Sequence, residues 1–350
     1  MIVDGIDEVY MRRCLQLAQN GAGQVSTNPM VGCVIVHNGR IIGEGYHPKF
    51  GEAHAEVNAI NAVTDKNLLP ESTLYVSLEP CSHHGKTPPC SDLIIGNKLK
   101  CVVVGTVDTF SQVAGRGIER LKAAGIEVKW GVLENECRHL NRRFFCFNEK
   151  KRPYVILKWA QTDNGLIGRT PEENHLDRQI SNPAVNMLVH RWRTEEDAIL
   201  VGKNTAIQDN PRLTARLWQG KNPVRVLLDP ELTIPPTLNI FSNESDTLIF
   251  NGVSQMKNGH LAFEKIDFTG QVQQQVLERL YDRSIQSVII EGGSITLQHF
   301  IDAGLWDEAR IITSPVYWKK GIKAPVINGR VSARENIGGD TVTWMYRETV

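Results

Sequence analysis

Three potential metal ligands and one carboxylate, carried by separate segments in the first 90 residues, constrain the fold most strongly. His54 and Glu56 lie in the sequence His54-Ala55-Glu56, and eight residues separate Cys81 from Cys90. One imidazole and two thiolates make three zinc ligands, the number that a catalytic zinc uses when it keeps one position open for water. A carboxylate beside the ligands is of the right type to move protons. The fold must therefore bring these segments to one point, and we expect a catalytic zinc there.

Two interpretations of this site remain open from the residues alone. Zinc deaminases use a His/Cys/Cys ligand set with a glutamate that is not a ligand, but their usual pattern has two residues between the cysteines. The alternative is a structural zinc, which is closed by four protein ligands. His83 or His84, between the cysteines, could supply the fourth ligand. A structural site needs no neighbouring acid, so Glu56 favours the catalytic interpretation.

Length, charge and cysteine usage limit the class of protein. A chain of 350 residues is long enough for two domains, each with its own core. The 39 basic residues balance the 39 acidic ones, so no overall field favours nucleic acid or a membrane surface. There is no apolar run of about 18 residues and no apolar signal segment at the N-terminus. Seven cysteines, an odd number, indicate a reducing compartment, and we expect a cytoplasmic protein with five of them in cores.

Hydrophobic periodicity predicts alternating helices and strands in the first region, which is typical of an α/β domain. Asn38-Gly39 predicts a hairpin turn between two strands. The expected helices are 9–20, 53–63, one starting near residue 90, 117–124 and 138–148, and the expected strands are 31–36, 40–45, 74–78 and 101–105.

A charged run that ends in proline, residues 149–153, marks the expected domain boundary. We therefore expect one domain over residues 1–148 and a second over residues 149–350. The clearest strands of the second domain are expected at 154–158, 198–201, 224–228, 247–250, 287–290 and 308–313, which again predicts an α/β fold.

Several motifs resemble one known family. They are Asn28-Pro29-Met30-Val31-Gly32, Gly45-Tyr46-His47 and the segment 79–90, Glu-Pro-Cys-Ser-His-His-Gly-Lys-Thr-Pro-Pro-Cys. Together they resemble the bifunctional riboflavin-biosynthesis deaminase–reductases, whose two cysteines show this long spacing. The resemblance implies a cytidine-deaminase-like α/β/α domain followed by an α/β domain similar to dihydrofolate reductase.

For the first domain, the resemblance implies a zinc-dependent deaminase. His54, Cys81 and Cys90 would bind Zn²⁺, and Glu56 would carry protons. The implied substrate is a small phosphorylated molecule, a diaminopyrimidinone with a ribosylamino 5′-phosphate. Asn28, His83 and Lys86 are candidate substrate contacts, because amide, imidazole and ammonium groups suit a base edge or a phosphate. The alternatives are a turn cap for the asparagine and solvated loop residues for the other two.

For the second domain, no Gly-x-Gly-x-x-Gly follows a strand, so a standard dinucleotide-binding fold is not indicated. A glycine turn at Gly292-Gly293 instead joins a strand to a helix, and such a helix start suits a phosphate. The order of the motifs resembles the family's reductase half, which uses NADPH. The resemblance implies cofactor contacts from Ala160, Thr205, Asp209, Gly293, Ser294 and Ile295, and substrate contacts from Lys158, Arg193, Leu213, Arg216 and Glu291.

Three segments depart from the family pattern in the second domain. They are Asp163-Asn164-Gly165, the positions Asp177 and Gln179, and residues 314–321. The competing functions are a deaminase with a non-reducing second domain, a nucleic-acid base deaminase, and a zinc-stabilised binding protein. The balanced charge speaks against nucleic acid. We expect a bifunctional homo-oligomeric enzyme that acts on a small molecule.

Overall fold

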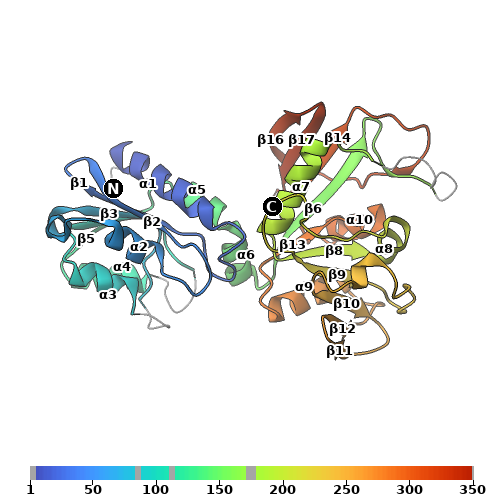
Figure 1. The fold of residues 1–350 in the computed structure, drawn as a ribbon, viewed down its shortest axis with the longest axis horizontal. Helices are drawn as coiled ribbons and strands as arrows, with labels where there is room; N and C mark the ends of the chain where they lie inside the picture. The colour runs from blue at the N-terminus through green and yellow to red at the C-terminus, as the bar shows by residue number, and fades with distance from the viewer. Residues whose placement is uncertain (1–4, 83–87, 110–114, 171–178, 349–350) are drawn as a thin grey trace. The chain divides into compact units, whose positions relative to one another are not determined.

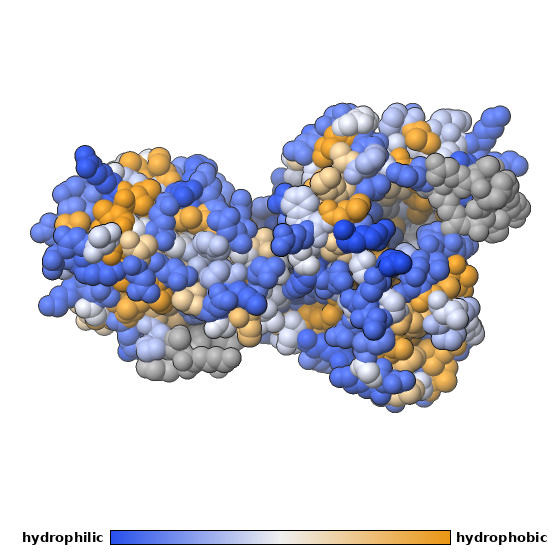
Figure 2. All heavy atoms as spheres, in the orientation of Figure 1, coloured by the Kyte–Doolittle hydropathy of each residue, from blue (hydrophilic) through white to orange (hydrophobic). Residues whose placement is uncertain are grey.

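The computed structural model describes residues 5–82, 88–109, 115–170 and 179–348, and its chain divides into two compact units, Met1–Lys151 and Arg152–Val350 (Figure 1). The division falls inside the charged run of residues 149–153. Hydrophilic side chains cover most of the face drawn in Figure 2, with smaller hydrophobic areas between them. Within the described ranges, no helix has both the length and the apolar character needed to cross a membrane.

The first unit is built on a five-stranded sheet in the order β2-β1-β3-β4-β5. The β1 strand pairs antiparallel with β2 and β3, whereas β3, β4 and β5 are parallel. The predicted hairpin is confirmed: Asn38 and Gly39 have φ of 46° and 76°, as a tight turn between β1 and β2 requires. The strands are β1 (Gly32–His37), β2 (Arg40–Tyr46), β3 (Thr73–Leu78), β4 (Cys101–Thr106) and β5 (Glu127–Trp130).

Helices cover both faces of this sheet. Alternate residues of β1 point to opposite faces: Cys33 and Ile35 join one core, and Val34 joins the other. The first core is closed by α2 (Ala55–Ala62), α3 (Cys90–Gly96) and α4 (Arg116–Ala123), and the second by α1 (Gly5–Ala18) and α5 (Glu134–Leu140). The expected α/β/α layers of a cytidine-deaminase-like domain are therefore confirmed.

One expected helix, 138–148, is wrong, because the segment is divided into α5 and α6 (Arg142–Lys150). Asn141 lies between them with φ −98° and ψ 23°. Its side-chain amide donates to the carbonyl of Met30 and accepts from the Met30 N–H, each at 2.8 Å. The break in the helix thus lets one side chain hold the loop before β1. Short 3₁₀ helices cover Gln19–Gly21 and Lys66–Glu71.

The second unit contains a ten-stranded sheet in the order β11-β12-β10-β9-β8-β13-β6-β14-β17-β16. The seven strands from β12 to β14 in this order are parallel, and β11, β17 and β16 are antiparallel additions. The strands are β6 (Tyr154–Thr162), β8 (Ala198–Gly202), β9 (Val224–Leu228), β10 (Thr247–Asn251), β11 (Met256–Asn258), β12 (Leu261–Lys265), β13 (Ser287–Ile290), β14 (Glu308–Ser314), β16 (Arg330–Ile337) and β17 (Asp340–Tyr346). A small sheet pairs β7 (Leu166–Gly168) with β15 (Ile322–Lys323).

Helices again lie on both faces. Leu200 of β8 packs with α9 (Val272–Asp282) and α10 (Ser294–Asp302), whereas Ile199 and Val201 pack with α8 (Lys203–Asp209). The remaining helix, α7 (Pro183–Glu195), begins after Asn182, whose side chain accepts a hydrogen bond from the Val185 N–H. The 3₁₀ helix Asn239–Phe241 follows β9. This α/β arrangement confirms the expected fold class and gathers the carboxyl ends of β8, β13 and β6 at one edge.

Candidate active sites

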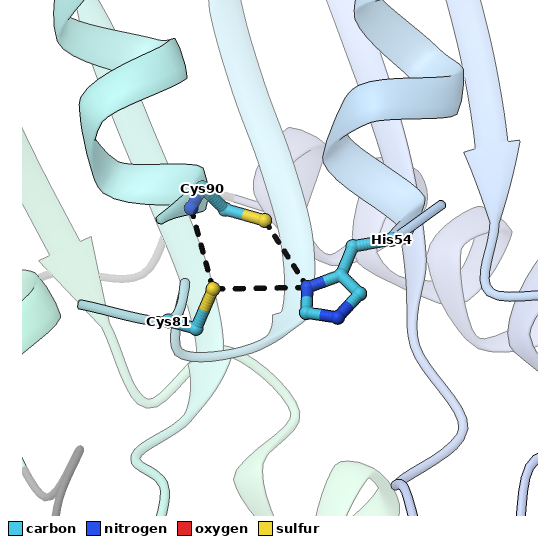
Figure 3. Close-up of side chains that lie close together, drawn as sticks. All are labelled: His54, Cys81 and Cys90. Atoms are coloured by element: carbon cyan, nitrogen blue, oxygen red, sulfur yellow. Dashed lines mark hydrogen bonds between the residues drawn. The ribbon is translucent and has the colours of Figure 1, made fainter. Parts of the chain in front are cut away.

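The three expected zinc ligands converge in the first unit (Figure 3). His54 directly precedes α2, Cys81 follows β3, and Cys90 is the first residue of α3. The Nδ1 atom of His54 lies 3.3 Å from the Cys90 Sγ and 3.7 Å from the Cys81 Sγ. A tetrahedral zinc with bonds of about 2.0–2.3 Å separates its ligand atoms by about 3.3–3.8 Å. The donor set therefore fits Zn²⁺ in both chemistry and spacing.

Local structure favours the thiolate form of Cys81. The backbone N–H of Cys90, at the start of α3, donates to the Cys81 Sγ at 3.2 Å. Hydrogen bonds from the Cys90 thiol, from the His54 imidazole and from this N–H lower the pKa of Cys81 to about 4. Because a metal-bound cysteine must be deprotonated, a low pKa of Cys81 favours the binding of a metal cation at this site.

Glu56 lies in the first turn of α2 and is 3% exposed. Its burial, followed by the nearby Cys81 charge, raises its pKa from the usual value to about 7. The expected helix over 53–63 begins two residues later than predicted, because His54 is the extended N-cap of α2, with φ −72° and ψ 164°. His54 and Glu56 therefore do not need to share a helix face to lie at the same site.

A buried histidine that was not among the expected site residues connects Asn28 to the metal ligands. The His47 Nδ1 lies 3.1 Å from the Ala53 carbonyl oxygen, and its Nε2 lies 3.1 Å from the Asn28 Nδ2. Since a carbonyl only accepts, Nδ1 carries the proton and Nε2 accepts from the amide. The His47 and His54 rings meet edge to face with centroids 5.4 Å apart. A histidine at the end of the hairpin, seven residues before a ligand, was the available signal. His83 and Lys86, and also His84, lie outside the described residues.

A cluster of charged side chains marks the edge of the sheet in the second unit. Lys158 lies on β6 and Glu291 directly follows β13. The Glu291 carboxylate accepts from the Arg193 Nε at 3.1 Å and Nη2 at 2.8 Å, and the Lys158 Nζ lies 3.8 Å from it. Although burial alone raises the pKa of Glu291, the Arg193 and Lys158 charges lower it to about 2. The expected residues Lys158, Arg193 and Glu291 are thus brought together.

The loop after α8 closes one side of this cluster. The Arg193 Nη1 donates to the Thr214 carbonyl at 3.2 Å, and the preceding Leu213 is a buried residue with φ 56°. The side chain of Arg216 is on the exposed part of the loop. Burial, and then the charges of Arg193 and Arg216, lower the pKa of the neighbouring His190 to about 4. Leu213 is therefore a core residue of this loop, and Arg216 belongs to the electrostatic surroundings of the cluster.

The glycine turn between β13 and α10 approaches β8 very closely. A Cβ atom on Gly292 would lie 2.6 Å from the Val201 Cα, and one on Gly293, whose φ is 59°, would lie 3.3 Å from the Thr205 Oγ1. The first backbone N–H groups of a helix have no partner inside the helix. The turn thus brings Gly293, which directly precedes the first residues of α10, Ser294 and Ile295, beside Thr205. Such a helix start suits a cofactor phosphate.

The other two expected cofactor residues lie at the same edge of the sheet. Asp209 ends α8, one turn after Thr205 on the same helix face. Ala160 lies on β6, two positions after Lys158 and so on the same face of the sheet. The strand order β8-β13-β6 makes these segments neighbours at their carboxyl ends, where ligands of open α/β sheets bind. The residues present fit a nucleotide cofactor.

Two of the segments that depart from the family pattern contact each other. The Asn164 Nδ2 donates to the Trp318 carbonyl at 2.8 Å, and the Trp318 N–H lies 3.4 Å from the Asn164 Oδ1. Trp318 packs with Leu166 and Ile180, beside Ala160. Gln179 donates to the Ser181 carbonyl, and Asp177 lies outside the described residues. The unusual turn and the unusual tryptophan segment therefore support one another.

Comparison with known proteins gives matches to both units. The family profile described as "Cytidine and deoxycytidylate deaminase zinc-binding region" matches residues 5–106, and the profile described as "RibD C-terminal domain" matches residues 153–318. Proteins called "Riboflavin biosynthesis protein RibD" are similar over most of their length. The one from Aquifex aeolicus is 36% identical over 98% of this chain and 99% of its own, and the one from Bacillus amyloliquefaciens is 39% identical over 93% and 88%.

Two solved structures share the architecture over nearly the whole chain. The Thermotoga maritima diaminohydroxyphosphoribosylaminopyrimidine deaminase/5-amino-6-(5-phosphoribosylamino)uracil reductase superposes with a TM-score of 0.89 at 36% identity, over 98% of this chain and 99% of its own. Acinetobacter baumannii RibD, form 1, superposes with a TM-score of 0.88 at 28% identity, also over 98% and 99%.

Proposed function

This chain belongs to the RibD family of bifunctional riboflavin-biosynthesis deaminase–reductases, and we propose that residues 1–151 carry the deaminase and residues 152–350 the reductase. The enzyme hydrolytically deaminates 2,5-diamino-6-ribosylamino-4(3H)-pyrimidinone 5′-phosphate and then reduces the ribosyl group to a ribityl chain, with Zn²⁺ and NADPH as cofactors. The assignment of one activity to each unit is supported by the two compact units and by the two family profiles that match them separately.

In the deaminase, His54, Cys81 and Cys90 are the residues that would hold zinc. The ion, when bound, supplies Lewis-acid activation of water at neutral pH. Glu56 takes a proton from the attacking water and delivers it to a ring nitrogen or to the departing ammonia. Its burial excludes bulk water from this transfer, and its side chain interacts with Cys90, Cys81 and His54 of the ligand set. Water and the amine are thereby converted to a carbonyl and ammonia.

Asn28 orients the pyrimidine in this proposal. Because its Nδ2 donates to His47, the Asn28 Oδ1 is available to accept a hydrogen bond from an N–H of the base. His47 fixes the direction of this amide, since its other nitrogen donates to the Ala53 carbonyl beside His54. His83 and Lys86 are proposed as further substrate contacts on the resemblance alone.

In the reductase, Ala160, Thr205, Asp209 and the turn Gly293, Ser294 and Ile295 would hold NADPH, which supplies hydride when bound. Lys158, Arg193, Arg216 and Glu291 would line the substrate side. Leu213, whose side chain is buried in the core, would offer only backbone atoms there. Three of the five N–H groups of Arg193 are used by Glu291 and Thr214, which leaves two for substrate oxygens. Glu291 and Lys158 form a buried pair of opposite charges. In this proposal the pair lies at the reacting end of the sugar.

We also propose that the enzyme works in the cytoplasm as a homo-oligomer, and that it does not act on nucleic acid. The equal numbers of acidic and basic residues support the last point. Among the described residues β16 is an edge strand that pairs only with β17, and Val331 on it is 40% exposed. This edge supports association, because an edge strand can pair with another strand. A deaminase with a non-reducing second unit and a nucleic-acid base deaminase are both disfavoured by relatives that match over 99% and 88% of their own length.

The observation that carries the proposed function is the convergence of His54, Cys81 and Cys90 beside the buried Glu56. The test uses the purified full-length protein with the diaminopyrimidine substrate, with and without NADPH. Ammonia release and NADPH oxidation are measured separately. We expect ammonia in both reactions and NADPH oxidation only where the deaminated product has formed. Ammonia release without any NADPH oxidation would support the non-reducing alternative.

A further inference from the structure

Glu79 is a buried carboxylate, 4% exposed, two residues before the metal ligand Cys81. Its Oε2 accepts from the backbone N–H groups of Asp108 at 3.2 Å and Gly115 at 2.9 Å. Its Oε1 accepts from the N–H groups of Gly117 at 2.8 Å and Ile118 at 3.2 Å. One side chain therefore satisfies four backbone donors from a segment about 30–40 residues further along the chain.

Two of these donors belong to the first turn of α4, which has no cap of its own. Gly115 occupies the N-cap position and has no side chain to offer. The free N–H groups of a first turn need acceptors, and a negative charge there also interacts favourably with the helix dipole. Glu79 supplies both from outside the helix, and so fixes the start of α4 against the end of β3.

Helix α4 approaches the segment of Glu79 and Pro80 so closely that only glycine fits at position 117. A Cβ atom on Gly117 would lie 2.1 Å from the Pro80 carbonyl oxygen. Pro80 joins Glu79 to Cys81, and its ring restricts the backbone between them. The start of α4 and the backbone that leads into Cys81 are therefore packed as one piece.

One turn after Gly117, on the same face of α4, Arg120 reaches the segments of both thiol ligands. The Arg120 Nη2 lies 2.6 Å from the Asp92 Oδ1, two residues after Cys90, and its Nη1 lies 3.5 Å from the Ser82 carbonyl, one residue after Cys81. The Ser91 N–H also donates to the Cys81 carbonyl at 3.1 Å. Helix α4 thus links the two cysteine segments.

We propose that Glu79 is a positioning residue of the zinc site: it caps α4 from the end of β3, and through α4 and Arg120 it holds Cys81 and Cys90 at the spacing the ion requires. The inference rests on the proposed zinc site but assigns a role to a residue outside the ligand set. Partners that orient metal ligands typically change metal affinity by about 10–100-fold when they are removed.

The test compares Glu79→Gln with two matched variants of α4 in the full-length protein. An amide keeps one acceptor oxygen and turns an NH₂ group towards two N–H donors. Glu119→Gln removes an exposed charge from the same first turn, and Leu121→Val creates a small cavity under the same helix, where Leu121 is fully buried. Zinc affinity is measured by chelator competition, and ligand geometry by the thiolate-to-cobalt charge-transfer spectrum of the Co²⁺ protein. Thermal unfolding and NADPH binding are followed in the same samples.

We expect Glu79→Gln to lower zinc affinity at least tenfold and to alter the saturated Co²⁺ spectrum, with NADPH affinity unchanged. Glu119→Gln and Leu121→Val should keep both metal properties, even where Leu121→Val lowers the unfolding temperature equally. Unchanged zinc affinity and spectrum in Glu79→Gln, or equal losses in Leu121→Val, would overturn the proposal.

A second variant keeps the test decisive if Glu79→Gln does not fold. Arg120 is 43% exposed at its side chain, so its replacement should be tolerated, and Arg120→Gln should lower zinc affinity severalfold relative to the wild-type protein. Wild-type affinity in Arg120→Gln would then overturn the proposed link through α4. Failure of the wild-type protein to bind zinc or to release ammonia would instead count against the proposed function.

Discussion

Arg193 and Glu291, separated by 98 positions in the sequence, are joined by two parallel hydrogen bonds of 3.1 and 2.8 Å. The pair lies at the carboxyl edge of the second sheet, and Lys158 approaches the same carboxylate to 3.8 Å. The side chains of Arg193 and Glu291 are only 11% and 9% exposed, so solvent screens their interaction weakly. This geometry makes the arginine both a structural partner of Glu291 and a candidate substrate ligand.

Replacement of Arg193 by lysine should impair the reductase. Lysine keeps the charge but cannot form the parallel pair with Glu291. We expect the substrate KM of the reductase to rise at least tenfold and the unfolding temperature to fall, with ammonia release unaffected. Arg191→Lys, an exposed position on the same helix with a surface ion pair to Glu195, is the matched control. An unchanged KM in Arg193→Lys would remove this residue from the substrate site.

Arg216→Lys should act on binding without acting on stability. Arg216 is exposed, so it contributes little to folding, but its charge already affects the pKa of His190 in the cluster. We expect the substrate KM to rise about three- to tenfold, as for the loss of one bidentate phosphate contact, with the NADPH Kd and the unfolding temperature near the wild-type values. Arg212→Lys, an exposed position paired with Glu244, is the control. Equal kinetics in the two variants would show that Arg216 does not meet the substrate.

The Glu291 carboxylate should make the free energy of unfolding depend on pH in the acidic range. Its folded pKa of about 2 lies below the value of about 4.3 for an unfolded glutamate. The folded state therefore binds fewer protons, and this contribution is complete above about pH 4.3 and is lost as the pH falls towards 2. The difference in unfolding free energy between wild type and Glu291→Gln, measured by denaturant titration, should shrink from pH 5 to pH 2. A difference that is constant over this range would contradict the assigned pKa.

The glycine turn before α10 should tolerate no side chain at Gly292. A methyl group there would lie 2.6 Å from the Val201 Cα and 3.0 Å from the Gly202 nitrogen, both backbone atoms that cannot rotate away. Gly292→Ala should therefore displace the turn and raise the NADPH Kd at least tenfold, while zinc-dependent deamination continues. Gly168→Ala, whose Cβ would meet Ile322 at an ordinary 3.5 Å, is the control. Equal NADPH affinity in both variants would exclude the turn from the cofactor site.

The sequence predicted those parts of the fold that have a strong local signal. Apolar runs such as 198–201 and 287–290 are strands of a parallel sheet. Both faces of such a sheet are covered, so every residue in these runs is buried. The ligand set was predictable because zinc chemistry limits the residue types. By contrast, β16 (Arg330–Ile337) was not expected, since it is short of large apolar residues and seven of its eight residues are exposed.

Long-range contacts explain what sequence patterns could not supply. The helix over 138–148 was predicted as continuous, because its break depends on a clamp between Asn141 and Met30, 111 positions earlier. The hydrogen bonds of Glu79 and the Arg193–Glu291 pair likewise join segments whose proximity follows only from the completed sheets. Such contacts can be identified only in the folded structure, where a buried charged side chain is found next to a partner that is distant in the sequence.

Glu56→Gln should separate zinc binding from proton transfer. Glu56 is not among the ligand atoms that converge within 4.8 Å, so the amide should leave zinc stoichiometry and affinity near the wild-type values. It cannot accept a proton, so we expect ammonia release to fall at least about a hundredfold, as for the loss of a general acid/base. Reduction of the separately supplied deaminated intermediate should continue, because the charged cluster and glycine turn of the second unit are unchanged. Glu52→Gln, an exposed position four residues earlier, controls for the loss of one negative charge. Retained ammonia release by Glu56→Gln would exclude it as the proton carrier, whereas loss of zinc together with activity would indicate that Glu56 serves the metal site structurally.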